Sequence, residues 1–154
     1  MKENLLDAKL INLNIQASDN VDAINQLGKM LVDNNYIDPS YTKSVIEREQ
    51  TFPTGLVLAS AGIAIPHASP ENNVLKNGIA AISLVKPVKF HSMENPDSEI
   101  DVDMVFMLAL ANSNDHLDVL KKLFVAFQNQ SLVNALKHST DKAEFLKLLT
   151  NNLI

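Results

Sequence analysis

The stretch Gly62-Ile63-Ala64-Ile65-Pro66-His67-Ala68 decides how the rest of the chain is read. Its isoleucines alternate with small residues, a pattern that is typical of a short strand buried on both faces. Pro66 has no N–H to give to a sheet ladder, so regular strand pairing is expected to end there. The stretch therefore predicts a buried strand that ends by presenting His67 among small side chains, where the imidazole is open to a large partner.

A second run, residues 101–111, is apolar at almost every position and predicts the central strand of the same sheet, with helices above and below it. Further strands are predicted at residues 10–15, at 79–85 and, after Pro87, as a short edge strand at 88–90. The apolar spacing predicts helices near residues 20–34, 38–50, 116–127, 132–136 and 141–149, and polar loops at 51–60 and 91–99.

The order of these elements predicts the fold class. Strands alternate with helices early in the chain but follow one another in its middle, which favours a mixed sheet over an all-parallel one. We therefore expect an α/β fold in which residues 1–154 form a single domain, with a mixed parallel and antiparallel sheet flanked by helices on both faces.

Composition narrows the class of function. The net charge of −5, without a basic stripe, argues against nucleic acid as a partner and fits a protein partner with a basic patch. The absence of cysteine excludes a disulfide framework, a thiolate nucleophile and a cysteine zinc site. With no signal-peptide pattern and no apolar run long enough to span a bilayer, a cytoplasmic protein is expected, which reaches a membrane only through a partner.

The histidines are the candidate reactive groups. His91, in a polar loop, and His138, at a helix end, are interpreted as solvated side chains. His116 opens the helix after the central strand, where free backbone N–H groups attract anions. If the strands before His67 and His116 are parallel neighbours, both imidazoles lie on one rim of the sheet, the usual place for a ligand site. Two imidazoles and an arginine suit phosphoryl transfer, one imidazole attacking phosphorus and the other stabilising the transferred group.

Other chemistries have weaker support. The glycine-rich loops that bind nucleotides are absent, as is a Gly-x-Ser-x-Gly nucleophile elbow. A phosphoryl donor would then be another phosphorylated molecule, most simply a protein, and no cofactor is expected. A zinc site built from His67, His116 and Asp115 or Asp118 lacks ligand spacing, so no metal is expected and a metal-dependent hydrolase is the weakest alternative.

Several motifs occur in an order that resembles the enzyme IIA domain of the mannitol/fructose type in the sugar phosphotransferase system. They are Arg48-Glu49, Phe52-Pro53-Thr54-Gly55, the Ile-Pro-His segment that ends at His67, and the apolar run that leads into His116. The resemblance covers about residues 19–149. The Phe-Pro-Thr-Gly loop and the short chain are most similar to the galactitol-type member.

The resemblance implies a role for each residue. His67 would be phosphorylated by the histidine phosphocarrier protein and would pass the phosphoryl group to a cysteine of a cognate enzyme IIB, while the membrane component IIC would be reached only indirectly. His116 matches the second active-site histidine, and Arg48 matches the arginine that contacts the phosphoryl group. Two departures stand out: the segment between Arg48 and His67 is longer than in mannitol-type members, and some galactitol-type members lack the second histidine, which gives His116 a supporting role.

The alternative to a transport component is a regulatory module. Such a protein would carry the same phosphohistidine, but its phosphorylation would control binding to a transporter, a kinase or a transcription factor. Transfer to an enzyme IIB cysteine would distinguish the two.

Overall fold

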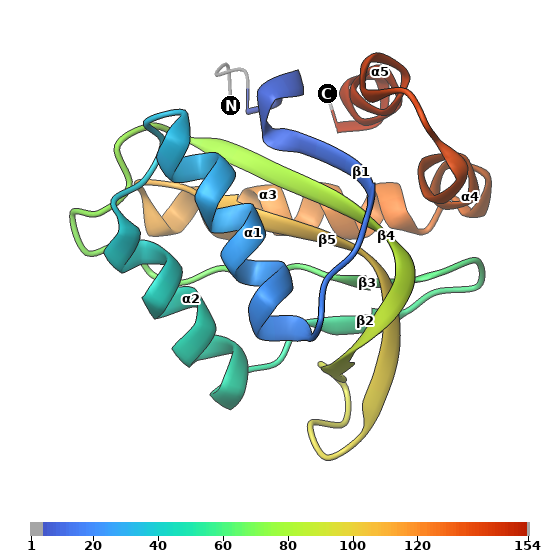
Figure 1. The fold of residues 1–154 in the computed structure, drawn as a ribbon, viewed down its shortest axis with the longest axis horizontal. Coiled ribbons are helices and arrows are strands. Elements are labelled where there is room, and N and C mark those ends of the chain that lie inside the picture. The colour runs from blue at the N-terminus through green and yellow to red at the C-terminus, as the bar shows by residue number, and fades with distance from the viewer. Residues whose placement is uncertain (1–4, 154) are drawn as a thin grey trace.

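The described part of the chain, residues 5–153 without the side chain of Ser113, holds one five-stranded sheet in a computed structural model (Figure 1). The strand order is β1-β4-β5-β3-β2. The strands are β1 (Ile11–Ile15), β2 (Gly55–Val57), β3 (Gly62–Ala64), β4 (Gly78–His91) and β5 (Glu99–Ala109). β1 runs parallel to β4, β3 runs parallel to β5, and the β4–β5 and β2–β3 pairs are antiparallel. The predicted mixed sheet is confirmed.

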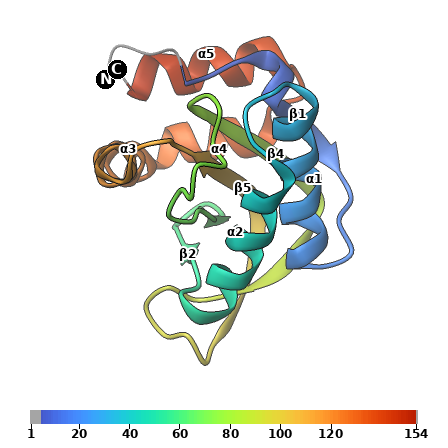
Figure 2. The same ribbon diagram turned by 90° about the vertical axis from the view of Figure 1, so that its left-hand side faces the viewer.

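Helices cover both faces of this sheet, as predicted (Figures 1 and 2). They are the short 3₁₀ helix η1 (Ala8–Leu10) and α1 (Asn20–Asp33), α2 (Pro39–Thr51), α3 (Ser113–Phe127), α4 (Gln130–His138) and α5 (Lys142–Leu153). α1 and α2 pack on one face, and α3, α4 and α5 pack on the other. None of the helices in residues 5–153 is long and apolar enough to cross a membrane.

β5 is the central strand, as its apolar sequence predicts. Val105 and Met107 belong to the core beneath α1 and α2, whereas Phe106 and Leu108 belong to the core beneath α3–α5. All four side chains are fully buried. This alternation follows from the two-residue period of a strand, and it explains why a strand covered on both faces is apolar throughout.

Two strand predictions need correction. Residues 79–85 and 88–90 are not two strands but parts of the continuous β4, because Pro87 lies inside the register break between Ser83 and Val88, where a missing N–H costs no ladder bond. Residues 51–60 are not wholly a loop, since they contain β2. That strand has only three residues, too few to show an alternating pattern.

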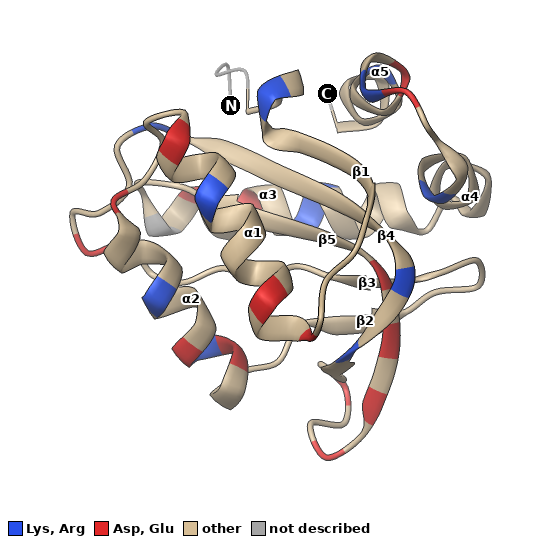
Figure 3. Ribbon diagram, in the orientation of Figure 1, with Lys and Arg blue, Asp and Glu red and all other residues tan. Residues whose placement is uncertain are grey.

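Charge is unevenly distributed over the ribbon. Acidic residues gather on the hairpin formed by β4 and β5, and acidic and basic residues alternate at the C-terminal end of α2 (Figure 3). That end of α2 lies beside the loop that precedes β2, and it brings a cation and a carboxylate to the part of the fold considered next.

Candidate active site

His67 and His116 lie together. β3 and β5 are parallel neighbours, so their carboxyl ends reach the same edge of the sheet. His67 follows β3 and His116 stands in the first turn of α3, after β5; their ring centroids are 5.5 Å apart and the rings are tilted by 33°. The prediction that the two imidazoles share one rim is confirmed.

The close approach of β3 to β5 depends on Gly62. A Cβ atom at this position would collide with the backbone carbonyl oxygen of Asp101. The Gly62 N–H donates to the Asp103 carboxylate at 3.0 Å, and Lys137 lies 3.8 Å from the same carboxylate. A glycine is therefore required where the strand that carries His67 joins the centre of the sheet.

His67 is held in one tautomer. Its Nδ1 lies 2.9 Å from the carbonyl oxygen of Ile65, an atom that can only accept a hydrogen bond, so Nδ1 carries the hydrogen and Nε2 carries the lone pair. Burial lowers the pKa of His67 below its ordinary value of 6.5; the Ile65 bond opposes this shift and the charge of Arg48 adds to it. The half-buried imidazole is therefore neutral near neutral pH, with a nucleophilic nitrogen.

His116 is buried, unlike an ordinary first-turn surface residue. Only 7% of it is exposed. Burial lowers its pKa to about 4, and the charge of Arg48 and that of His67 when it is protonated contribute to the shift. Its helix is capped by Asn112, whose side chain accepts a hydrogen bond from the Asn114 N–H. His116 is thus a neutral imidazole near neutral pH, in the position that the sequence predicts.

Arg48 reaches this site from α2. Its charge contributes to the lowered pKa values of both His67 and His116. Its guanidinium carbon lies 4.9 Å from the centre of the Phe52 ring. The segment between Arg48 and His67 folds back as the β2–β3 hairpin, in which Val57 pairs with Gly62.

Two buried nitrogens at this site have no hydrogen-bond partner. Among the described residues, Arg48 Nε and His116 Nε2 are the buried side-chain nitrogen or oxygen atoms in that condition. A buried polar atom without a partner costs about 1–3 kcal/mol, and such atoms in a native structure call for an explanation. The His116 ring lies 5.5 Å from that of His67, and the charge of Arg48 lowers the pKa of both histidines, so both nitrogens are suited to the oxygens of an anion bound there.

Sequence reasoning missed three buried polar groups around His67: Tyr41, Glu49 and Thr54. Glu49 is 6% exposed, and burial raises the pKa of its carboxyl to about 7, against the opposing effects of its Thr54 hydrogen bonds and of the charges of His91 and Arg48. Burial likewise raises the pKa of Tyr41 to about 12. The sequence did contain an indication of the buried Glu49. Tyr41, Val45 and Glu49 occur at helical spacing on one face of α2, and a carboxylate is unusual on the buried face of an amphipathic helix.

The remaining histidines lie outside the site. His91 and His138 are exposed, as predicted, and their Nδ1 atoms lie 2.8 and 2.9 Å from the carbonyl oxygens of Pro96 and Asn134. The described residues contain no group of three or more His, Cys, Asp or Glu side chains placed to hold a metal.

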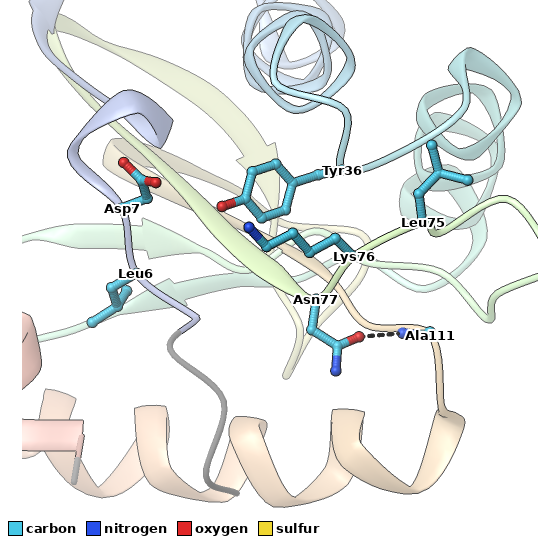
Figure 4. A pocket seen from close by; sticks show the side chains of 7 residues that line it. All are labelled: Leu6, Asp7, Tyr36, Leu75, Lys76, Asn77 and Ala111. Atoms are coloured by element: carbon cyan, nitrogen blue, oxygen red, sulfur yellow. Dashed lines mark hydrogen bonds between the residues drawn. The ribbon is translucent and has the colours of Figure 1, made fainter.

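A pocket of about 530 Å³ opens near the start of β4, but it contains none of His67, His116 and Arg48. It is lined by Leu6, Asp7, Tyr36, Leu75, Lys76, Asn77 and Ala111 (Figure 4). The candidate active site therefore lies outside this cavity.

Comparison with known proteins identifies the fold and the site with one family. Residues 4–152 match the family described as "Phosphoenolpyruvate-dependent sugar phosphotransferase system, EIIA 2". The chain is 31% identical over 146 residues to the mannitol-specific EIICBA component of Escherichia coli K12, covering 94% of this chain but 22% of that protein. It is 27% identical over 150 residues to the ascorbate-specific EIIA component of Shigella boydii, covering 97% of this chain and 94% of that protein.

A solved structure of an enzyme IIA has the same fold as this chain. The complex of enzyme IIA mannitol with phosphorylated enzyme IIB mannitol from Escherichia coli superposes with a TM-score of 0.78 and 29% identity, over 95% of this chain and 97% of that chain. The chain spans about a fifth of the length of the mannitol components it matches, 22% in the Escherichia coli protein. It belongs to the EIIA 2 family of the phosphoenolpyruvate-dependent sugar phosphotransferase system, whose members are phosphotransferase relay proteins that carry phosphoryl groups.

Proposed function

We propose that His67 is the residue that carries the phosphoryl group, which it accepts from the histidine phosphocarrier protein and donates to a cysteine of a cognate enzyme IIB. The observation that supports this most strongly is the combination of a fixed tautomer and two unpartnered nitrogens. The Ile65 carbonyl holds the proton on Nδ1 of His67, while Arg48 Nε and His116 Nε2 have no other hydrogen-bond partner.

Transfer of the phosphoryl group to His67 requires no loss of a proton from the imidazole. The lone pair on Nε2 attacks phosphorus, the new N–P bond forms, and the bond from phosphorus to the donor's imidazole nitrogen breaks, so that this nitrogen keeps the electron pair. The positive charge that develops on the His67 ring is stabilised through Nδ1–H by the Ile65 carbonyl. In the second half, a thiolate of enzyme IIB attacks phosphorus, a P–S bond forms, and Nε2 regains its pair.

The surrounding residues have separate roles in this scheme. The Arg48 guanidinium offsets the negative charge of the phosphoryl oxygens, which is largest in the transition state. His116 is neutral because burial lowers its pKa to about 4, so it acts as a hydrogen-bonding group and not as a second cation. Phe52 and Leu117, both 59% exposed, flank these residues in the chain and offer apolar contact area to two successive protein partners.

The carbohydrate that we propose is a sugar alcohol of the galactitol kind, taken up through a membrane component IIC that this chain does not touch, while the chain itself works in the cytoplasm. The support is the resemblance of the loop from Phe52 to Gly55. Since the relatives named above are mannitol- and ascorbate-specific, mannitol and ascorbate are the matched controls when uptake is tested in cells that lack the gene.

The decisive experiment follows the phosphoryl group onward. The protein is phosphorylated with phosphoenolpyruvate, enzyme I and the phosphocarrier protein, and is then mixed with purified enzyme IIB. Loss of the group from this chain with its gain on the enzyme IIB cysteine is expected, and His67→Ala is expected to abolish both. Phosphorylation of His67 without transfer to any enzyme IIB encoded in the same genome would replace the transport role with the regulatory one.

A further inference from the structure

The backbone on either side of His67 is held by side chains from α2 and from the loop that follows it. On the near side, the Ile65 N–H, one residue beyond β3, donates to Thr54 Oγ1 at 3.1 Å. On the far side, the Ala68 N–H donates to the Tyr41 hydroxyl at 3.2 Å, and that hydroxyl donates to the Leu108 carbonyl at 2.6 Å. His67 therefore sits in a short segment whose two ends are separately fixed.

The near side depends on a buried carboxylate. Glu49 accepts two hydrogen bonds from Thr54, one from its N–H to Oε2 and one from its hydroxyl to Oε1, both at 2.8 Å. Because the hydroxyl hydrogen is used on Glu49, a lone pair of Thr54 Oγ1 is left for the Ile65 N–H. The Ile65 carbonyl in turn accepts from His67 Nδ1. The hydrogen bonds from Glu49 and the hydrogen bond to the imidazole thus meet at one residue, Ile65, through its N–H and its carbonyl.

The burial of the Glu49 carboxylate is not explained by a gain in the stability of the fold. None of the ion pairs among the described residues includes Glu49, and an ionised carboxylate that is buried without an ion pair is costly. Burial accordingly raises the pKa of Glu49 to about 7. A neutral side chain of similar size would avoid that cost but would not accept two hydrogen bonds from Thr54 on two oxygens.

We propose that Glu49, acting through the Thr54 hydroxyl, is a positioning residue that holds the backbone of Ile65, so that the Ile65 carbonyl fixes the Nδ1–H tautomer of His67 and directs Nε2 toward the phosphoryl donor. The effect on transfer rests on the function proposed above, whereas the effect on the tautomer does not. The two parts are therefore measured separately.

The tautomer is measured on the unphosphorylated protein by long-range ¹H–¹⁵N NMR of the histidine rings. In the wild type, Nδ1 of His67 is expected to be protonated and Nε2 not. Thr54→Val, which keeps the shape of the side chain but removes its hydroxyl, and Glu49→Gln are each expected to distribute the proton over both nitrogens. Thr54→Ser restores the hydroxyl and is expected to restore the wild-type pattern.

The transfer rate is measured with the phosphocarrier protein as donor. A displacement of about 1 Å in a reacting group can slow a reaction by about a hundredfold, so we expect Thr54→Val and Glu49→Gln to slow phosphorylation by roughly 10- to 100-fold. Ser44→Ala is the matched control. Ser44 lies in α2, as Glu49 does, but its hydroxyl donates to the Ser40 carbonyl of the same helix.

Each outcome decides the proposal. An unchanged His67 tautomer in Glu49→Gln and Thr54→Val would overturn it, as would a changed tautomer with an unchanged rate. If Thr54→Val does not fold, Glu49→Gln and Thr54→Ser decide in its place. A wild-type protein that accepts no phosphoryl group would refute the proposed function, while the NMR comparison would still test the positioning role.

Discussion

His67 and His91 share one local feature and differ in everything around it. Each has Nδ1 within 2.9 Å of a backbone carbonyl oxygen, that of Ile65 for His67 and that of Pro96 for His91. His67 lies beside His116 at the carboxyl end of the central strand, whereas His91 is exposed on the β4–β5 hairpin, where it pairs with Glu99 at the start of that strand. A fixed tautomer is therefore not enough to define an active site. His67 differs from His91 in having the buried imidazole of His116 beside it, the charge of Arg48 nearby, and hydrogen bonds that hold the backbone on both sides of it.

The largest effect is expected from removing Arg48, the cation near His67, in comparison with removing Lys89, the cation on the hairpin near His91. Arg48→Gln should slow phosphorylation of His67 by about 100-fold or more, because it deletes a charged donor that acts on the transition state. Lys89→Gln, which deletes an exposed cation on the hairpin, should leave the rate unchanged. Both rates are measured by quenched mass spectrometry, and equal rates in the two variants would contradict a role for Arg48 at the phosphoryl group.

A smaller effect is expected from the second imidazole. His116→Ala should slow phosphorylation by roughly 10-fold without preventing it, since it removes a group that stabilises the transition state and not the nucleophile. His138→Ala is the matched control, because His138 is exposed and outside the site. If His116→Ala left both phosphorylation and transfer to enzyme IIB at wild-type rates, His116 would be a bystander.

The burial of His116 also predicts how the stability of the folded protein changes in acid. Burial lowers the pKa of His116 from 6.5 in the unfolded chain to about 4 in the folded protein. As the pH falls through the window from 6.5 to 4, the unfolded chain therefore binds a proton at His116 before the folded protein does, and the folded protein loses stability. The difference corresponds to on the order of 3 kcal/mol between the two ends of the window. His116→Gln should remove most of this dependence in urea titrations at several pH values, and an unchanged slope would contradict the assigned environment.

Glu49 should show the opposite sign in the same titrations. Burial raises its folded-state pKa from 4.5 to about 7, so the folded state binds more protons in this window, and the contribution of Glu49 to stability falls as the pH rises. Glu49→Gln should therefore gain stability relative to the wild type as the pH increases from 4.5 to 7. A relative loss over that range would show that the carboxylate is ionised in the folded protein well below neutral pH.

The smallest effect is expected on the hairpin. Lys89 and Asp101 form an ion pair of 2.7 Å, but both side chains are 60% exposed. Exposed pairs of this kind contribute little to stability and are screened by salt. Lys89→Ala should therefore change the urea midpoint less than Glu49→Gln or His116→Gln does. A larger change than either would show that the hairpin contributes more to stability than the packing around His67.

The sequence predicted the parts of the site that depend on local pattern. Pro66 marked the end of the strand before His67, and the apolar run of β5 identified the central strand that leads to His116; parallel pairing of the two strands then placed both rings on one rim. What it did not predict is which partners the buried polar side chains meet. The stripe on α2 places Glu49 on the buried face, but its bonds to Thr54 exist because the loop after α2 turns back, and Thr54 in turn meets Ile65 across the β2–β3 hairpin.

The two strand errors have the same origin. β2 is defined by its pairing with β3, and the single continuous course of β4 is defined by its pairing with β5 on both sides of the register break. Neither partner is visible from the local sequence, in which Pro87 looks like the end of a strand and residues 55–57 look like part of a loop.

The proposed function depends on one residue: His67, and not another histidine, carries the phosphoryl group. Peptide mapping under alkaline conditions, after incubation with phosphoenolpyruvate, enzyme I and the phosphocarrier protein, tests it most directly. We expect one phosphoryl group per chain, on the peptide that contains His67, and none on the peptides that contain His91 or His138. Phosphorylation of either of those peptides, or no added mass when both upstream proteins are active, would contradict it.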